Sequence, residues 1–275
     1  MSEVINISKH GTNTSMFREL RDFRELLFFF TWRDIKVRYK QTALGMLWVI
    51  LQPLVLMGIV QMLLLKRLGN DFGAGEAPAY MMLLIGFTFW QFFEGSFANV
   101  INSFVSNSGL FGKIYFPKVL PAVSSILSRL VDFSMGIVMF ILVAVVFQHD
   151  INFWGLLMLI PLLLIMGLAA FGAGLFFGTL NVCFSDLKQV LPFVIRMLFI
   201  TTPIFWPLSI LPVWAHPIMY LNPGTAGIQT FREAMYAPEN IKWSWLLIPL
   251  ATMLMSLLIG VKFFRKREKE FIDIV

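Results

Sequence analysis

Long blocks of apolar residues, separated by short polar segments, dominate the chain. A helix that crosses about 30 Å of hydrocarbon needs roughly 20 predominantly apolar residues, because each residue adds only about 1.5 Å. Six blocks meet this requirement: residues 43–65, 79–101, 119–147, 153–180, 190–208 and 243–264. The pattern predicts an all-α integral membrane protein with six transmembrane helices.

Composition supports the same class. Of 275 residues, 58% are hydrophobic and 14% are charged, whereas a soluble domain is about half apolar and a quarter charged. This excludes an ordinary soluble globular protein. We expect one transmembrane domain over residues 1–275, made of a cytoplasmic N-terminal segment (1–42), a six-span bundle (43–264) and a cytoplasmic tail (265–275).

The basic residues are distributed unevenly between the two sides. Of the 22 Lys and Arg residues, 16 flank the spans on the side that carries both termini and four lie on the other side. Because cytoplasmic loops are enriched in Lys and Arg, both termini are expected in the cytoplasm. The net charge of +6 then matches the anionic cytoplasmic leaflet, and nucleic acid is not an expected partner.

Residues 16–42 precede the first span and alternate aromatic or aliphatic residues with Arg and Glu at helical spacing. This is typical of an amphipathic helix in the cytoplasmic interface. Its basic end carries Lys36, Arg38 and Lys40, where a lipid phosphate or pyrophosphate headgroup would be reached. Anchoring by the positive-inside rule explains these three residues equally well.

Two connecting segments are too apolar for free loops. Between spans two and three, Leu110, Phe111, Ile114, Tyr115 and Phe116 give a short cytoplasmic segment that either binds a partner or packs against the chain's own spans. Between spans five and six, residues 209–242 contain four prolines and several aromatics, which predicts short re-entrant or interfacial helices at the outer face. These could close an exit pathway or form an aromatic belt.

Four ionisable residues fall inside predicted spans: Glu94, Arg129, Asp132 and Arg196. Charges at this depth are costly unless they are paired or face water. Arg129 and Asp132 are three residues apart and can pair on one helix face, and Glu94 and Arg196 share a depth. Two ion pairs that fix the bundle are one interpretation, and a lining for an anionic headgroup is the other.

Span four contains the small-residue pair Gly174 and Gly178. Residues of this size four apart allow two helices to approach closely, either within the chain or across a dimer.

The sequence contains no residue pattern typical of a catalytic or metal site. The three histidines, His10, His149 and His216, are far apart, the chain has one cysteine (Cys183), and no catalytic or metal site is expected. The run from Gly109 to Lys113 lacks the spacing of a phosphate-binding loop. No cofactor is therefore expected in this chain, and if it takes part in transport energised by ATP, another subunit must bind the ATP and Mg.

Several segments resemble a known family. WRDIKVRYKQTALGMLW at residues 32–48, followed by LQPL at 51–54, GKIYFPK at 112–118, CFSDLKQ at 183–189 and NP at 222–223, is similar to the type-2 ABC exporter permeases for polysaccharides such as O-antigen, capsule and teichoic acid. The resemblance covers nearly the whole chain. Ser185 and Met46 depart from the family pattern, in which Arg and often Pro stand there.

The resemblance implies a multi-pass permease of the cytoplasmic (inner) membrane that pairs with a second copy of itself and with two ATP-binding cassette subunits. It implies that Asn107, Leu110, Phe111, Lys113, Tyr115 and Phe116 couple the permease to the ATPase. It also implies that Trp214, Tyr220, Asn222 and Pro223 belong to an outer gate, and that the cargo is a lipid-linked glycan, O-antigen first.

Three alternatives remain at this point. A type-2 exporter could carry teichoic acid, capsule, another lipid or a drug. A membrane glycosyltransferase would need acidic residues for a metal or base at the membrane surface, and the loop acids are scattered. A scaffold without a moving substrate is the third class.

Overall fold

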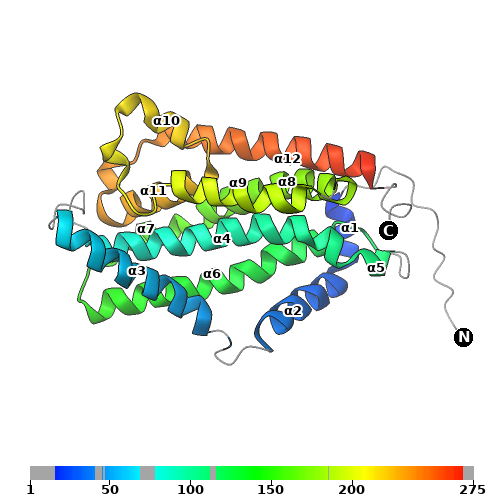
Figure 1. Cartoon of the computed structure of the whole chain (residues 1–275), viewed down its shortest axis with the longest axis horizontal. Helices are drawn as coiled ribbons and strands as arrows, with labels where there is room; N and C mark the ends of the chain where they lie inside the picture. Colours follow the sequence, from blue (N-terminus) through cyan, green and yellow to red (C-terminus); the bar gives the residue numbers. More distant parts are fainter. Residues whose placement is uncertain are drawn as a thin grey trace, which may run out of the picture.

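A computed structural model describes residues 16–40, 45, 47–68, 78–111, 116–184 and 186–268 of the chain. These residues form helices and loops, with no strand among them, which confirms the all-α class for this part of the chain (Figure 1). The α-helices are α1 (Met16–Asp22), α2 (Arg24–Lys40), α3 (Leu47–Leu68), α4 (Ala79–Ser106), α5 (Ser108–Phe111), α6 (Leu120–Val146), α7 (Phe153–Leu157), α8 (Leu159–Cys183), α9 (Leu187–Thr201), α10 (His216–Met219), α11 (Pro223–Tyr236) and α12 (Leu247–Arg267).

Three helical stretches are long and apolar enough to cross a membrane. They are α6, the combined run Phe153–Cys183 and the run Trp243–Arg267, while α3 carries a shorter apolar stretch, Leu47–Val60. The six predicted blocks each contain a helix. Three membrane-crossing helices are therefore supported by length and composition, and the number six remains a prediction.

Prolines explain where two helices depart from the predicted limits. Pro161 lies in the first turn of α8, where its missing N–H is tolerated, so the predicted fourth block divides into α7 and α8. The predicted fifth block is too long, because α9 ends at Thr201. Thr202 precedes Pro203 and is extended, as a residue before proline prefers.

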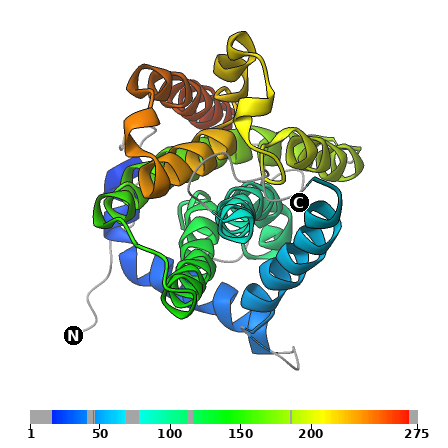
Figure 2. The ribbon, with the colours of Figure 1, turned by 90° about the vertical axis from the view of Figure 1, so that its left-hand side faces the viewer.

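Helix α4 occupies the centre of the bundle, with the other helices around it (Figure 2). Most of its side chains are buried, including Phe87, Phe89 and Trp90, so it is enclosed by protein on most of its surface. The residues that line a site within the bundle are therefore expected to come from α4 and the helices against it.

Small residues set the closest helix contacts. A Cβ added at Gly174 would lie 2.6 Å from Cγ1 of Val100, and one at Gly178 would lie 2.7 Å from Cδ2 of Phe104. Both neighbours belong to α4, so the predicted small-residue pair packs within the chain, one of its two predicted uses. An even closer approach joins α8 and α12, because a Cβ at Gly260 would lie 2.0 Å from the carbonyl oxygen of Gly172.

The N-terminal helix α2 lies along the half of α6 that begins at Leu120 (Figure 1). Phe30 of α2 is buried in a cluster with Phe116, Leu120 and Phe264. About one helical turn further along α2 and α6, the hydroxyl of Ser124 donates a hydrogen bond of 3.0 Å to Asp34. The aromatic face of the predicted amphipathic helix thus packs partly on protein, while Phe28, Phe29 and Trp32 stay exposed.

The segment between α9 and α12 contains short helices, while their location at the outer face stays a prediction: α10, α11 and the 3₁₀ turns Leu208–Ile210, Val213–Ala215, Pro238–Asn240 and Trp243–Leu246. Helix α11 packs on α4 and α8. A cation, Arg232, is buried within it and donates hydrogen bonds to the carbonyl oxygens of Met82 (2.6 Å), Pro203 (2.6 Å) and Ile204 (2.9 Å). Arg232 therefore ties α11 to α4 and to the break after α9.

Candidate functional site

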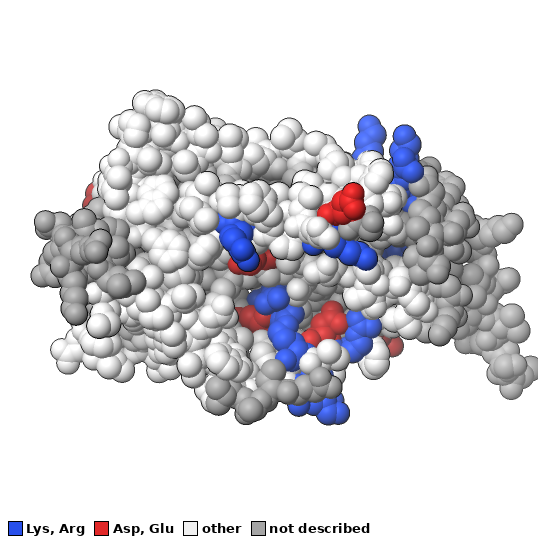
Figure 3. Space-filling model, viewed as in Figure 1, with Lys and Arg blue, Asp and Glu red and all other residues white. Residues whose placement is uncertain are grey.

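Charged side chains gather in and around a hollow in the middle of one face (Figure 3). A cleft of about 460 Å³, which we name the first cleft, opens here between α2, α3, α4 and α6. Its polar lining comprises Arg38, Tyr39, Gln52, Thr88, Gln91, Glu94, Arg129 and Asp132, and its apolar lining includes Trp48 and Phe92. Three of the four predicted intramembrane charges thus share one site with a residue of the N-terminal helix.

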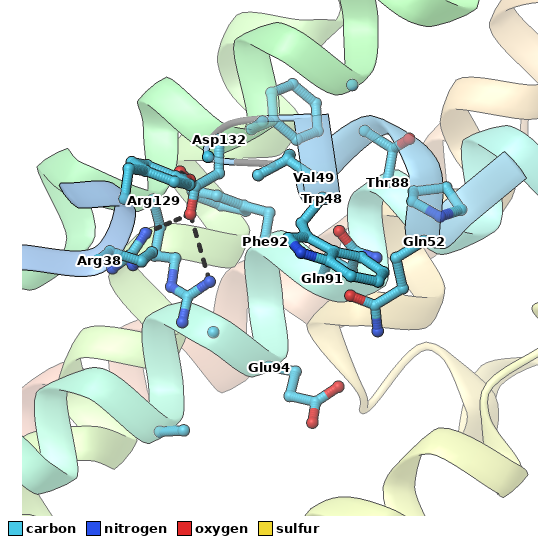
Figure 4. Close-up of a pocket in the computed structure, with 17 residues that line it drawn as sticks. Arg38, Trp48, Val49, Gln52, Thr88, Gln91, Phe92, Glu94, Arg129 and Asp132 are labelled. Carbon is cyan, nitrogen blue, oxygen red and sulfur yellow. Dashed lines mark hydrogen bonds and ion pairs between the residues drawn. The ribbon is translucent and has the colours of Figure 1, made fainter. Parts of the chain in front are cut away.

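Asp132 is the centre of the charged group. The predicted pair with Arg129 is confirmed, with Nη1 of Arg129 3.2 Å from Oδ2 of Asp132. The same carboxylate oxygen accepts a hydrogen bond from Arg38, and the other oxygen accepts one from the hydroxyl of Tyr39. Figure 4 shows the two arginines converging on Asp132 at one side of the cleft, with the amides of Gln52 and Gln91 on the other side.

The neighbours of this group keep its members in place. Arg38 also donates to the hydroxyl of Ser128 at 3.2 Å, and Arg129 donates to the amide oxygen of Asn99 at 3.2 Å. Burial, followed by the Asp132 carboxylate, raises the pKa of Tyr39 to about 12, so Tyr39 is a neutral donor at physiological pH. Arg38 and Arg129 outnumber the single carboxylate of Asp132 in this group, and Glu94 supplies a second carboxylate to the cleft. The formal charges of the lining therefore cancel, and an anion would be bound by the arginine hydrogen-bond donors rather than by excess positive charge.

The three predicted headgroup residues have different surroundings. Arg38 points into the first cleft, whereas Lys36 and Lys40 are exposed on α2. Lys36 Nζ lies 5.4 Å from the ring centroid of Trp32. The helical spacing of α2 separates Arg38 from the two lysines, so they do not form one cluster.

The proposed pairing of Glu94 with Arg196 was wrong. Among the residues that the structure describes, Glu94 has no ion pair within 4.0 Å and instead accepts a hydrogen bond of 2.5 Å from Nε1 of Trp90. Arg196 is exposed on α9. Equal depth in two helices was an insufficient criterion, because a pair also requires facing side chains.

A second cleft of about 490 Å³ lies between α3, α4, α8 and α9. It shares Gln52, Gln91, Glu94 and Ala98 with the first cleft, so the two meet along α3 and α4. Asn102, Asn181, Lys188 and Arg196 supply the rest of its polar lining. Glu94 and Arg196 therefore border one cleft without pairing.

Part of the predicted coupling segment is anchored in the bundle. The Phe111 and Phe116 rings pair at 5.7 Å, and Phe116 also meets Phe30 at 5.5 Å. Asn107 is buried and donates to the carbonyl oxygen of Ser103 at 2.8 Å, while Leu110 is half-buried. Lys113 and Tyr115 lie outside the described residues. Phe111 and Phe116 thus pack against the chain itself, as the alternative interpretation of this segment predicted.

The predicted outer-gate residues also occupy different environments. Trp214 is exposed, whereas Tyr220 is buried and meets the Trp245 ring at 5.6 Å. Asn222 caps α11, because its side chain accepts a hydrogen bond from the N–H of Gly224 and donates one to Thr202, both at 2.9 Å. Pro223 follows as the first residue of α11, where proline is favoured.

Sequence reasoning did not single out Gln52, Gln91 and Asn181. The available signal was an amide side chain inside an apolar block, which indicates a polar cavity or a helix contact.

No group of three His, Cys, Asp or Glu suited to a metal ion occurs in the described part of the chain.

The helices and the charged clefts define a helical membrane protein with a polar cavity among its spans. Residues 25–236 match the family described as ABC-2 type transporter, and the chain belongs to this family. It is 28% identical over 256 residues to the O-antigen export system permease protein RfbA of Klebsiella pneumoniae, covering 91% of this chain and 95% of that protein.

Two further relatives are also named as export or transport proteins. The RfbA protein of Myxococcus xanthus is 24% identical, covering 94% of this chain and 98% of the relative. The polysialic acid transport protein KpsM of Escherichia coli is 26% identical, covering 86% and 91%. The chain is thus an ABC-2 permease related to polysaccharide export permeases, as its motifs predicted.

Proposed function

We propose that this protein is the transmembrane subunit of an ATP-driven exporter that moves a lipid-linked polysaccharide, of the O-antigen type, across the cytoplasmic membrane. The family membership and the names of three relatives support this proposal. The observation that carries it is the first cleft, in which two arginines, two amides and two carboxylates line a cavity among apolar helices.

The first cleft suits the phosphate end of such a cargo. Arginine presents a planar fork of donors that matches phosphate oxygens, and Arg38 and Arg129 bring two of them to one carboxylate. A phosphate would compete with Asp132 for these donors. Lys36 and Lys40 of α2 are exposed nearby along the helix and would attract the headgroup from the membrane surface.

The energy would come from two copies of an ATP-binding cassette subunit, which hold ATP and Mg. The segment that couples the permease to this subunit would comprise Asn107, Leu110, Phe111, Lys113, Tyr115 and Phe116. Of the described residues in this segment, Gly109 is exposed and Phe111 is buried against Phe116. An exposed docking residue next to a ring packed in the bundle can pass a displacement to α4 and α6.

In this proposal the chain is one transmembrane domain with six spans and both termini in the cytoplasm. A second copy of the chain would complete the pathway. Trp214, Tyr220, Asn222 and Pro223 would belong to the element that closes its outer end, with α11 as the fixed part, because Asn222 and Arg232 bind it to the bundle.

The test is purification of the tagged protein from its own membranes in mild detergent, followed by assay of ATPase activity. We expect a P-loop subunit in stoichiometric amount, and loss of the activity when that subunit is removed. A purified chain without an ATPase under gentle conditions would contradict the proposal.

A further inference from the structure

The second cleft contains two buried polar atoms that the fold leaves unused. Nε2 of Gln91 and Oδ1 of Asn181 are shielded from solvent and have no hydrogen-bond partner within the described residues. Asn181 is only 4% exposed, and both side chains line this cleft. Because buried polar groups in proteins are nearly always hydrogen-bonded, these two atoms indicate a missing partner.

The chemistry of the two amides describes that partner. An amide offers donors through its nitrogen and lone pairs through its oxygen. A ligand that satisfies both Gln91 and Asn181 must therefore have groups that donate as well as accept. Hydroxyl groups do both, and a sugar ring carries several of them at fixed spacing.

Aromatic rings line the same cleft. Trp90 and Phe199 meet at 5.6 Å between ring centroids, and both border the cleft together with Phe87. The carboxylate of Glu94 is held beside them by the N–H of Trp90. Apolar walls with a few placed polar groups are typical of small-ligand sites, and aromatic walls beside amides and a carboxylate fit a sugar, which has apolar C–H faces and a polar edge.

We propose that the second cleft binds a sugar unit of the transported chain through Gln91 and Asn181, next to the anionic end held in the first cleft. This inference rests on the proposed function, because it assumes that the cargo is a lipid-linked glycan. The two clefts meet at Gln52, Gln91, Glu94 and Ala98. A phosphate-linked sugar has the same order of parts, an anion beside a ring of hydroxyl groups.

The test uses the photo-crosslinking residue p-benzoylphenylalanine in cells that make the glycan. One variant carries it at Ile195, which lines the second cleft, and a second carries it at Met197, which is on the same helix but is exposed and does not line the cleft. A third carries it at Leu258, exposed on α12, to measure background. After irradiation, glycan bound to the permease is detected by carbohydrate staining of the purified band.

We expect a glycan adduct from Ile195 well above the level from Leu258. In the Ile195 background, Gln91→Met or Asn181→Leu is expected to reduce the adduct by about five- to tenfold, since each removes one hydrogen bond to a buried site. An adduct from Met197 without one from Ile195 would put the glycan on the outer face of α9 and overturn the proposal. Undiminished adducts in both amide variants would also overturn it.

Thermal unfolding separates a binding role from a structural one. An unpaired buried amide lowers stability, so Asn181→Leu is expected to keep or raise the unfolding temperature while the adduct is lost. A lower unfolding temperature would show that the amide supports the fold, against the proposal. If the parent protein exports no glycan at all, the proposed function is wrong. If it exports glycan but the amide variants give an unchanged adduct, only the proposed sugar site is wrong.

Discussion

Arg38 of α2 and Asp132 of α6 form an ion pair across 94 residues of the chain. It joins the N-terminal helix to a membrane-crossing helix at the edge of the first cleft. The link is supported by Tyr39, which donates to the same carboxylate group. Whatever moves α2 relative to α6 must therefore break or reshape the site that we assign to the phosphate end of the cargo.

Replacing Asp132 tests this link. Asp132→Asn would leave Arg38 and Arg129 facing each other without a carboxylate, and the side chain of Asp132 is only 11% exposed. Because removing one partner of a largely buried pair is costly, we expect a loss of about 2–3 kcal/mol. Thermal unfolding in detergent measures it, and an unchanged unfolding temperature would contradict a stabilising link.

The matched control for this change is Asp150→Asn. Asp150 is exposed between α6 and α7, so an effect of less than about 0.5 kcal/mol is expected there. Equal losses in both variants would show that the effect does not come from the pair with Arg38.

The contact between Gly172 and Gly260 gives a second prediction. Gly260→Ala would place a methyl group 2.0 Å from the Gly172 carbonyl oxygen, so α8 and α12 would have to separate. Overpacking of this kind costs about 1–3 kcal/mol. Gly58→Ala on α3 is the control, because nothing lies within 4 Å of its added Cβ, and there the better helix propensity of alanine predicts no loss. Thermal unfolding of both variants tests this prediction, and equal unfolding temperatures would contradict it.

Arg232 gives a third prediction. Arg232→Met removes the donors to Met82, Pro203 and Ile204 and leaves buried carbonyl oxygens unpaired, which is expected to cost about 3 kcal/mol. Arg196→Gln, at an exposed arginine, is the control and should be close to neutral. A stable Arg232→Met protein would mean that α11 is held in place by its apolar contacts alone.

The coupling segment allows fold and coupling to be separated. Phe111→Ala is expected to lower stability by about 3 kcal/mol, because Phe111 is buried against Phe116. Gly109→Glu adds an exposed side chain with no atom within 4 Å of its Cβ, so the fold should be kept while the ATPase subunit fails to bind. Co-purification measures binding. Retention of the ATPase by a folded Gly109→Glu protein would exclude the surface around Gly109 as the docking point.

The approximate positions of the long helices could be predicted from the sequence, because the length of an apolar block shows whether a helix there could cross the membrane. The Arg129 and Asp132 pair followed from spacing on one helix. The contribution of Arg38 to the same group could not be predicted, because it depends on how α2 docks on α6. The role of Arg232 could not be predicted either, since only the break after α9 presents the carbonyl oxygens of Pro203 and Ile204 that it binds.

Export of a lipid-linked polysaccharide, the function that we propose for this permease, can be measured directly in cells. The experiment compares the surface polysaccharide and the lipid-linked intermediates in cells with and without the gene for this chain. We predict that deletion abolishes the surface polymer, that lipid-linked chains accumulate inside the cell, and that the wild-type gene restores export. An unchanged surface polymer in the deletion strain, with no intermediate accumulating, would contradict the proposed function.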